Sequence, residues 1–172
     1  MFGNATFYVH NLENNQTIFA FDNTACSEFG RIVTSANFLL NGSEPMEIRN
    51  HHSLAFVYGS TLVKQGPDAA TSAFNAVKTD TDHYYLSEWE FNQLGGNLLY
   101  GSSFEGLERL AVEVFKMNTF LFPASFNTYD SYAEGLRTVG KKQEAIIMFQ
   151  KSIPLNPDNV EVKKKLEELL KK

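Results

Sequence analysis

The chain has 172 residues and a formal net charge of −5, with 43% apolar and 20% charged residues. This composition is typical of a folded protein and excludes wholesale disorder, and the length suits one compact domain or a small unit joined to a repeat array. Because the sequence has no basic stripe, nucleic acid is not expected as its main partner. The one basic run, Lys163 to Lys165, stands among acidic residues and is interpreted as the solvated face of a terminal helix.

A single cysteine, Cys26, excludes an intrachain disulfide and a CxxC metal site. No window approaches the roughly 18 apolar residues that a membrane span requires, and no basic region followed by an apolar run marks a signal peptide. The sequence as written therefore predicts a cytoplasmic protein. A periplasmic or extracytoplasmic location is expected instead if the chain is a fragment of an exported protein.

Residues 6–22 are predicted to form a β-hairpin, in which LENN supplies the turn. The alternating apolar residues are Phe7 and Val9 in the first strand and Phe19 and Phe21 in the second. The stretch CSEFGRIVTSANFLLNG then places apolar residues at helical spacing, with Gly42 at the position of a helix end. A connector that carries Pro45 follows this helix.

From Ser53 onward the pattern is helical. SLAFVYGSTLVKQG and PDAATSAFNAVK are predicted as a helix pair, in which Gly66 ends the first helix and Pro67 opens the second. After the polar break TDTDHYY come five more helices, joined by short turns that indicate antiparallel neighbours. They are SEWEFNQLGGNLLYG, FEGLERLAVEVFKMNTFLF, SFNTYDSYAEGLRTVG, KQEAIIMFQKSI and VEVKKKLEELLKK.

Large and small residues recur at fixed offsets in the last 85 residues. A unit that begins at Phe126 and closes at Pro157 has large residues facing its partner helix, small Ala133 and Ala145 where the two helices approach, and Gly140 in the turn. The large residues are Tyr129, Tyr132 and Leu136 in the first helix and Phe149 and Ile153 in the second. This pattern resembles tetratricopeptide repeats, helix–turn–helix units of about 34 residues. Pro154 departs from it and is expected to loosen the last turn.

The preceding unit follows the same pattern with about four extra residues around YGSSFEGL, roughly one helical turn. Its matching residues are Phe91, Leu94, Gly95 and Leu98, then Ala111, Phe115 and Pro123. From Val160 the chain resembles the capping helix of a repeat array, with Asp158 or Asn159 as its N-cap. The helix pair at 53–78 is either a degenerate third repeat or a plain packing pair.

The sequence thus predicts a mainly α protein: an N-terminal β-hairpin and helix, followed by a tetratricopeptide-like antiparallel helical array, an α-solenoid. The expected parts are residues 1–43, a helix pair at 53–80, and repeats with a capping helix at 87–172. The resemblance implies a concave groove formed by the first helices of the repeats, in which a peptide or partner helix lies. The predicted groove residues are Trp89, Asn92, Gly96, Tyr100, Asn127, Asp130, Glu134 and Arg137. Asp130 and Glu134 disfavour the acidic C-terminal peptides that some members of this class bind.

No catalytic or metal-binding constellation stands out. Phosphate-loop, His-Glu-x-x-His and Gly-x-Ser-x-Gly motifs are missing from the sequence, so no cofactor or metal is expected. The adjacent His51 and His52 are on a connector and seldom converge on one metal in such an arrangement. Cys26 is interpreted as structural, because no histidine is placed to serve it. The cluster of Trp89, Tyr84 and Tyr85 is either a ligand platform or, in our preferred interpretation, packing or groove lining.

The first part of the chain, FGNATFYVHNLENNQTIFAFDNTACSEFGRIVTSANFLLNG, resembles the C-terminal end of serine β-lactamase-like hydrolases. The resemblance implies two final sheet strands and a closing helix, and some bacterial members of that group carry a tetratricopeptide tail. The catalytic Ser-x-x-Lys, Tyr-x-Asn and Lys-Thr-Gly motifs are missing: Thr61 with Lys64 has the spacing but the wrong nucleophile, and Asp80 follows Lys78-Thr79. If the resemblance holds, the chain is a C-terminal fragment without the chemistry.

The expected function is therefore that of a non-enzymatic protein–protein interaction or self-association module. A two-stranded ribbon is marginal in water by itself, and the apolar TIFAF segment carries no charge to discourage strand pairing. The sequence accordingly predicts a homodimer organised through residues 1–43.

Overall fold

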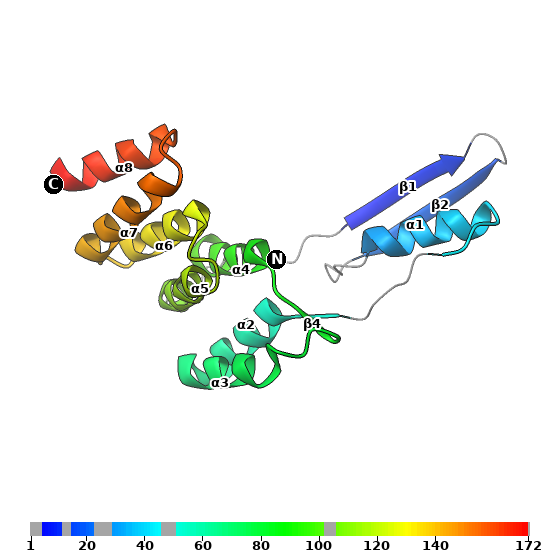
Figure 1. Ribbon diagram of the computed structural model, residues 1–172, viewed down its shortest axis with the longest axis horizontal. Coiled ribbons are helices and arrows are strands. Elements are labelled where there is room, and N and C mark those ends of the chain that lie inside the picture. Colours follow the sequence, from blue (N-terminus) through cyan, green and yellow to red (C-terminus); the bar gives the residue numbers. More distant parts are fainter. Residues whose placement is uncertain (1–4, 12–14, 23–28, 46–50, 102–105, 172) are drawn as a thin grey trace. The chain divides into compact units, whose positions relative to one another are not determined.

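The computed structural model describes residues 5–11, 15–22, 29–45, 51–101 and 106–171 (Figure 1). The prediction of a mainly helical protein is confirmed, since eight helices are present in these residues. The chain divides into two compact units, Met1–His51 and His52–Lys172. Outside the described residues lie the first three residues of the LENN turn, Cys26 and residues 102–105 of the YGSSFEGL segment. The side chains of Phe7, Val9 and Phe21 are not described either.

The first unit is a two-stranded ribbon with a helix beside it (Figure 1). Strands β1 (Ala5–Asn11) and β2 (Gln16–Asp22) pair antiparallel, with Tyr8 opposite Phe19. The rings of these two residues meet edge to face at 6.2 Å, and both side chains are exposed. Aromatic cross-strand pairs of this kind stabilise a ribbon.

Helix α1 (Phe29–Leu40) contacts β2. Val33 is buried, whereas Ile32, Leu39 and Leu40, expected on the apolar face, are exposed. A narrow ribbon covers only one stripe of a helix, which explains why Val33 is buried and the other apolar residues are exposed. Gly42, at a φ of 70°, ends the helix, because the amides of Gly42 and Ser43 donate to the carbonyls of Leu39 and Phe38 in a Schellman motif.

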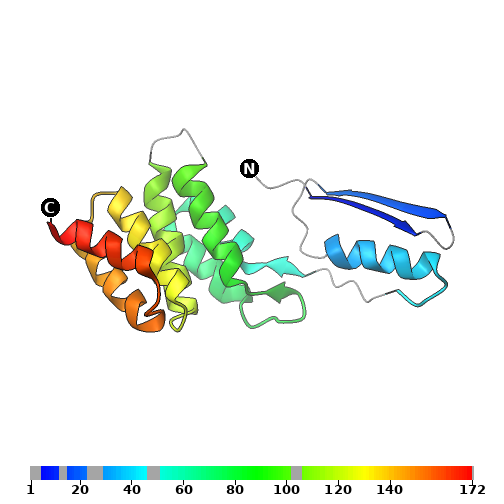
Figure 2. The same cartoon turned by 90° about the horizontal axis from the view of Figure 1, so that it is seen from above.

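In the described residues the second unit contains seven helices, and most of them pack against the next helix along the chain (Figure 2). They are α2 (Leu54–Gln65), α3 (Pro67–Val77), α4 (Glu88–Tyr100), α5 (Leu107–Leu121), α6 (Phe126–Thr138), α7 (Lys142–Leu155) and α8 (Val160–Lys171). The most extensive helix contacts are within the pairs α2–α3, α4–α5 and α6–α7. Contacts between α5 and α6 connect the last two pairs. A short parallel pairing of β3 (His52–Ser53) with β4 (Tyr84–Tyr85) was not predicted; it ties the start of α2 to the chain before α4.

Local signals begin and end these helices. The Ser53 hydroxyl accepts a hydrogen bond from the Phe56 amide and caps α2, and the Ser87 hydroxyl accepts one from the Glu90 amide and caps α4. Gly140, at a φ of 80°, ends α6 in a second Schellman motif, in which the Lys141 amide donates to the Leu136 carbonyl at 2.8 Å. Pro154 stands in the last turn of α7, and the helix nevertheless continues to Leu155.

The core runs along the array as a series of clusters between neighbouring helices. Phe74 and Phe91 join α2–α3 to α4, and both are almost completely buried. Ala111, Ala133, Ala145 and Phe149, which the repeat pattern assigns to the helix contacts, have no exposed surface. Val162 of α8 packs in the cluster of Ala133 and Phe149, so α8 covers the end of the core.

Phe115 of α5 lies between two glycines. A Cβ atom on Gly95 of α4 would come within 2.4 Å of the Phe115 ring, and one on Gly135 of α6 within 3.0 Å. The missing side chains let α4 and α6 approach the same ring from two sides. This close packing sets the spacing between α4 and α6, where the candidate site lies.

Candidate functional site

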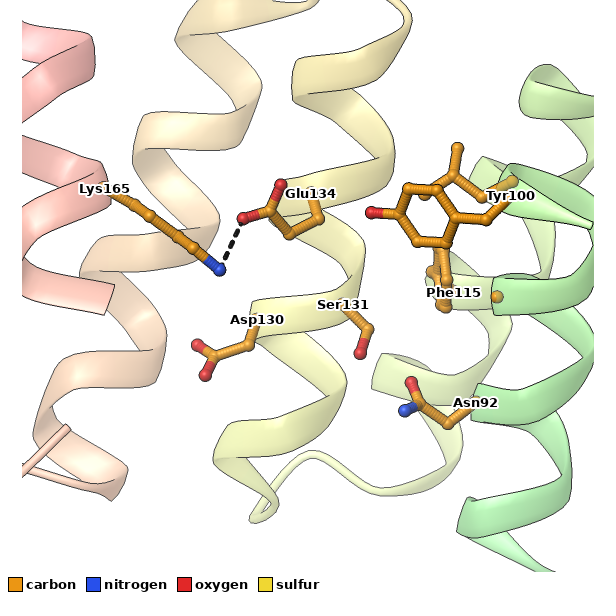
Figure 3. Close-up of a pocket in the computed structure, with 9 residues that line it drawn as sticks. Asn92, Tyr100, Phe115, Asp130, Ser131, Glu134 and Lys165 are labelled. Atoms are coloured by element: carbon orange, nitrogen blue, oxygen red, sulfur yellow. Dashed lines mark ion pairs between the residues drawn. The ribbon is translucent and has the colours of Figure 1, made fainter. Parts of the chain in front are cut away.

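A pocket of about 230 Å³ opens between α4, α6 and α8 in the second unit (Figure 3). It is smaller than a cavity for a drug-sized molecule and suits a single side chain of a partner. Residues from four helices line it: Asn92, Gly96, Leu99, Tyr100, Phe115, Asp130, Ser131, Glu134 and Lys165.

Helix α4 and the Phe115 ring supply the floor and one wall. Leu99 and Phe115 are buried, while Tyr100 at the helix end is 70% exposed. Nothing lies within 4 Å of the position a Cβ would take on Gly96, so the backbone of α4 is open to the pocket there. The Asn92 side-chain oxygen is buried and has no hydrogen-bond partner. Such an atom is costly to leave unpaired, by about 1–3 kcal/mol.

Helix α6 supplies the opposite wall. Asp130 and Glu134 are four residues apart and therefore project from the same face of the helix. In Figure 3, Ser131 lies across from Asn92, whereas the carboxylates of Asp130 and Glu134 both point toward the side from which Lys165 enters. One oxygen of Asp130 accepts a hydrogen bond from the Asn159 side-chain amide at 3.0 Å.

Glu134 is the centre of an ion-pair network. Its carboxylate lies 2.9 Å from the Lys165 ammonium and 2.6 Å from the Arg137 guanidinium. The Lys165 ammonium also pairs with Glu161 at 2.7 Å, one turn away on α8. The Glu134 side chain is only 15% exposed, so this network is less screened by solvent than an ordinary surface pair. It connects α8 to the wall of the pocket.

The two acidic side chains have pKa values displaced in opposite directions. Burial raises the pKa of Asp130 above its ordinary value, although the Ser152 hydroxyl and the Lys165 ammonium oppose this. Burial also raises the pKa of Glu134, but hydrogen bonds from Lys165 and Arg137 outweigh it and the net pKa is below the ordinary value. Burial lowers the pKa of Lys165, and its carboxylate partners Glu161 and Glu134 reverse this to a net increase.

Five of the eight predicted groove residues line this one pocket: Asn92, Gly96, Tyr100, Asp130 and Glu134. The other three are not among its lining residues. Trp89 is 66% exposed on α4, and Arg137 pairs with Glu134 from outside. The Asn127 amide instead donates to Glu88 at 3.1 Å, next to the Ser125 hydroxyl, which donates to the same oxygen at 2.8 Å. Asn127 thereby helps to join the start of α4 to the start of α6.

Sequence reasoning missed Lys165, Leu99, Phe115 and Ser131 as lining residues. Lys165 was assigned to a solvated helix face together with its lysine neighbours. Its role depends on how α8 crosses α6, and a single helical pattern carries no information about that crossing. Ser131 is next to Asp130 in α6 and could have been found by widening the predicted stripe on that helix by one residue.

Other polar side chains have local roles. The His83 ring bonds the Asp80 carboxylate at 2.9 Å, the His10 ring bonds the Thr17 hydroxyl at 2.8 Å, and the Thr61 hydroxyl donates to the Val57 carbonyl within α2. The Tyr85 hydroxyl donates to the Glu90 carboxylate, and the Trp89 side chain is exposed. Within the described ranges, no three His, Cys, Asp or Glu side chains are grouped so as to hold a metal ion. In that same part of the chain, no helix is both long and apolar enough to cross a lipid bilayer.

No protein-family model matches this sequence, and no curated protein sequence matches it.

Proposed function

We propose that residues 52–172 form a tetratricopeptide-like solenoid that binds a peptide segment of a partner protein along α4 and α6. The observation that carries this proposal is the shared pocket. Asn92 and Asp130 occupy equivalent positions in the two repeat units, and so do Gly96 and Glu134, and all four line one hollow. In repeat proteins, equivalent positions of successive first helices form a continuous binding surface.

The packing of the helix pairs supports the same proposal. Small residues occupy the helix crossings, with Gly95 against Phe115 and with fully buried Ala133 and Ala145 in the next unit. The aromatic residue that follows, Phe115 or Phe149, is buried in each unit. This agreement of local pattern and packing is what a repeat architecture requires.

A blocking variant tests the proposal. Peptides selected from a display library of random short sequences on the wild-type chain are measured against Gly96→Phe, whose ring would occupy the open space at residue 96. Gly96→Ala is the matched control, because its single methyl group meets no neighbouring atom. Binding should be lost in Gly96→Phe and kept in Gly96→Ala. Failure to select any peptide, or equal binding to Gly96→Phe, would contradict the proposed function.

A second proposal concerns the first unit: residues 1–43 represent the end of a serine β-lactamase-like hydrolase without its catalytic groups. The order of two antiparallel strands and a helix that contacts β2 favours it. On this proposal the chain is not an enzyme and will not hydrolyse chromogenic β-lactams or simple esters. Mass spectrometry after treatment with a serine-directed acylating probe should show the unmodified chain, and stoichiometric acylation of any serine would refute the proposal.

Self-association is the third part of the proposed function. β1 and β2 each have a single strand neighbour among the described residues, so each offers an edge to a second copy of the chain. Exposed Tyr8 and Phe19 add an apolar face to the same ribbon.

A further inference from the structure

Most of the polar atoms that line the pocket can accept hydrogen bonds. The Asn92 oxygen is buried and unpartnered. The other polar lining groups are the Ser131 and Tyr100 hydroxyls, the Asp130 and Glu134 carboxylates and the Lys165 ammonium. A ligand that satisfies the acceptors among these atoms has to donate hydrogen bonds.

The charge of the lining has the same preference. It contains the two acidic residues Asp130 and Glu134 and one basic residue, Lys165. Lys165 shares its charge with Glu161, which stands beside the pocket. Arg137 also pairs with Glu134 from outside the lining, so the three carboxylates and two cations of this network keep one negative charge. An acidic cleft with apolar walls concentrates cations.

From these observations we propose that the pocket receives a basic side chain, lysine or arginine, of the bound peptide. This inference rests on the proposed peptide-binding function and specifies its ligand. The cationic head lies between Tyr100 and Glu134, within reach of the Asn92 oxygen. Its carbon stem lies over Leu99 and the open backbone at Gly96.

The size and shape of the pocket suit such a side chain. A volume of about 230 Å³ holds one long side chain and not a folded element. Lysine and arginine combine an apolar stem with a charged head, which matches a floor of Leu99 and Phe115 below a polar rim. The 70% exposed Tyr100 ring adds a face on which a cation is attracted by the ring electrons.

Lys165 is the internal competitor of this ligand. Its ammonium is 2.9 Å from Glu134, so it neutralises a carboxylate that the ligand's cation also needs. Lys165→Met keeps most of the stem and removes the charge, and it should strengthen the binding of a basic peptide. Glu134→Gln keeps the shape and removes the acceptor's charge, and it should weaken that binding. A ligand with an acidic side chain would respond to both variants in the opposite direction.

The experiment uses the full chain and pools of fluorescent short peptides that are random except for a fixed central lysine, arginine, norleucine or glutamate. Binding is followed by fluorescence anisotropy at about 0.15 M salt, where charges more than about 8 Å apart are largely screened. The lysine and arginine pools should bind wild type more tightly than the norleucine and glutamate pools. Glu134→Gln should weaken the basic pools roughly three- to tenfold, and Lys165→Met should strengthen them by a similar factor.

Matched variants separate a local effect from a change in net charge. Lys164→Met removes a neighbouring charge from an exposed position on α8, and Glu144→Gln removes one from an exposed position on α7. Both should leave the affinities nearly unchanged, because salt screens distant surface charges. Circular dichroism of each variant verifies that the helices are retained.

The outcomes distinguish this inference from the function on which it rests. If peptides bind and Gly96→Phe abolishes binding, but the norleucine or glutamate pool equals the basic pools, then the basic-ligand inference is wrong and the peptide groove stands. The same conclusion follows if Lys165→Met weakens the basic pools. If no pool binds, the proposed function fails and the inference fails with it.

Discussion

At the scale of single residues, two adjacent glycines in α4 have opposite surroundings. A Cβ on Gly95 would meet the Phe115 ring at 2.4 Å, whereas a Cβ on Gly96 would meet nothing within 4 Å. Gly95→Ala should therefore destabilise the fold by about 1–3 kcal/mol through overpacking. Gly96→Ala should stabilise it by roughly 0.5–1 kcal/mol, because alanine loses less entropy in a helix. Urea denaturation measures both, and a shift in the same direction for the two variants would contradict this packing.

Ala145 and Glu144 offer a second comparison of neighbours, in α7. Ala145 is completely buried at the contact with α6, while Glu144 is exposed and pairs with Lys141. Ala145→Leu should lower the melting temperature clearly, since additional methylenes in a filled core cost about 1–3 kcal/mol. Glu144→Leu should change it little. Thermal denaturation followed by circular dichroism decides, and similar melting temperatures for the two variants would mean that the helical phase of α7 is wrong.

At the scale of elements, α8 depends on its first turn. Of the two cap candidates in the sequence, Asn159 is the one whose side-chain oxygen accepts the Val162 amide, at 3.2 Å, and its amide group also donates to Asp130. Asn159→Ala should destabilise the C-terminal end by about 1 kcal/mol or more. Asp158→Ala, at an exposed position one residue earlier, should have little effect. Hydrogen exchange of the α8 amides measures the difference, and equal protection in the two variants would disprove the assigned cap.

Helix α6 carries two carboxyl groups whose effects on stability have opposite pH dependence. The pKa of Glu134 is below its ordinary 4.5 in the folded chain, so its stabilisation is present above about pH 4.5 and is lost as the pH falls through the folded value. The pKa of Asp130 is above its ordinary 3.8, so its charge opposes folding at neutral pH, and this penalty disappears as the pH falls toward 3.8.

Isosteric variants make these two effects measurable. Glu134→Gln should lower the free energy of unfolding at neutral pH and match wild type in acid below the folded pKa. The free energy of unfolding of Asp130→Asn, relative to that of wild type, should be higher at neutral pH than in acid. The variant removes a buried charge and keeps an oxygen that accepts the hydrogen bond from Asn159. Urea titrations from neutral to acid pH give both difference curves. Curves with the same sign of slope would contradict the assignment of the two environments.

At the scale of the whole molecule, the open edges of the ribbon are the basis of the proposed assembly. The expected homodimer, joined through residues 1–43, should have twice the chain mass of 19.4 kDa in light scattering at micromolar concentrations. Deleting residues 1–24 should give a monomer or insoluble protein, because the ribbon with its edges and exposed Phe19 is removed. An intact chain that is monomeric under these conditions would exclude the proposed dimer.

Much of the local structure and part of the site followed from the sequence. Glycine signals placed the C-terminal ends of α1, α2 and α6, because these signals act through hydrogen bonds within a few residues. The repeat pattern also identified five pocket residues, since the face of a helix on which a residue lies is fixed by a period of about 3.6 residues. Lys165 was not predicted, because its contact with Glu134 joins two helices whose crossing is set by packing.

The amino-acid sequence by itself determined the helical character of the chain, the ends of several helices and the residues that share each helix face. These properties depend on neighbours within one or two turns. Only the tertiary structure decided that Phe115 lies between two glycines, that Asn127 bonds Glu88, and that α8 brings a cation to an acidic pocket wall. The physical reason is that such contacts depend on the distance and angle between whole helices, which result from the packing of many side chains together.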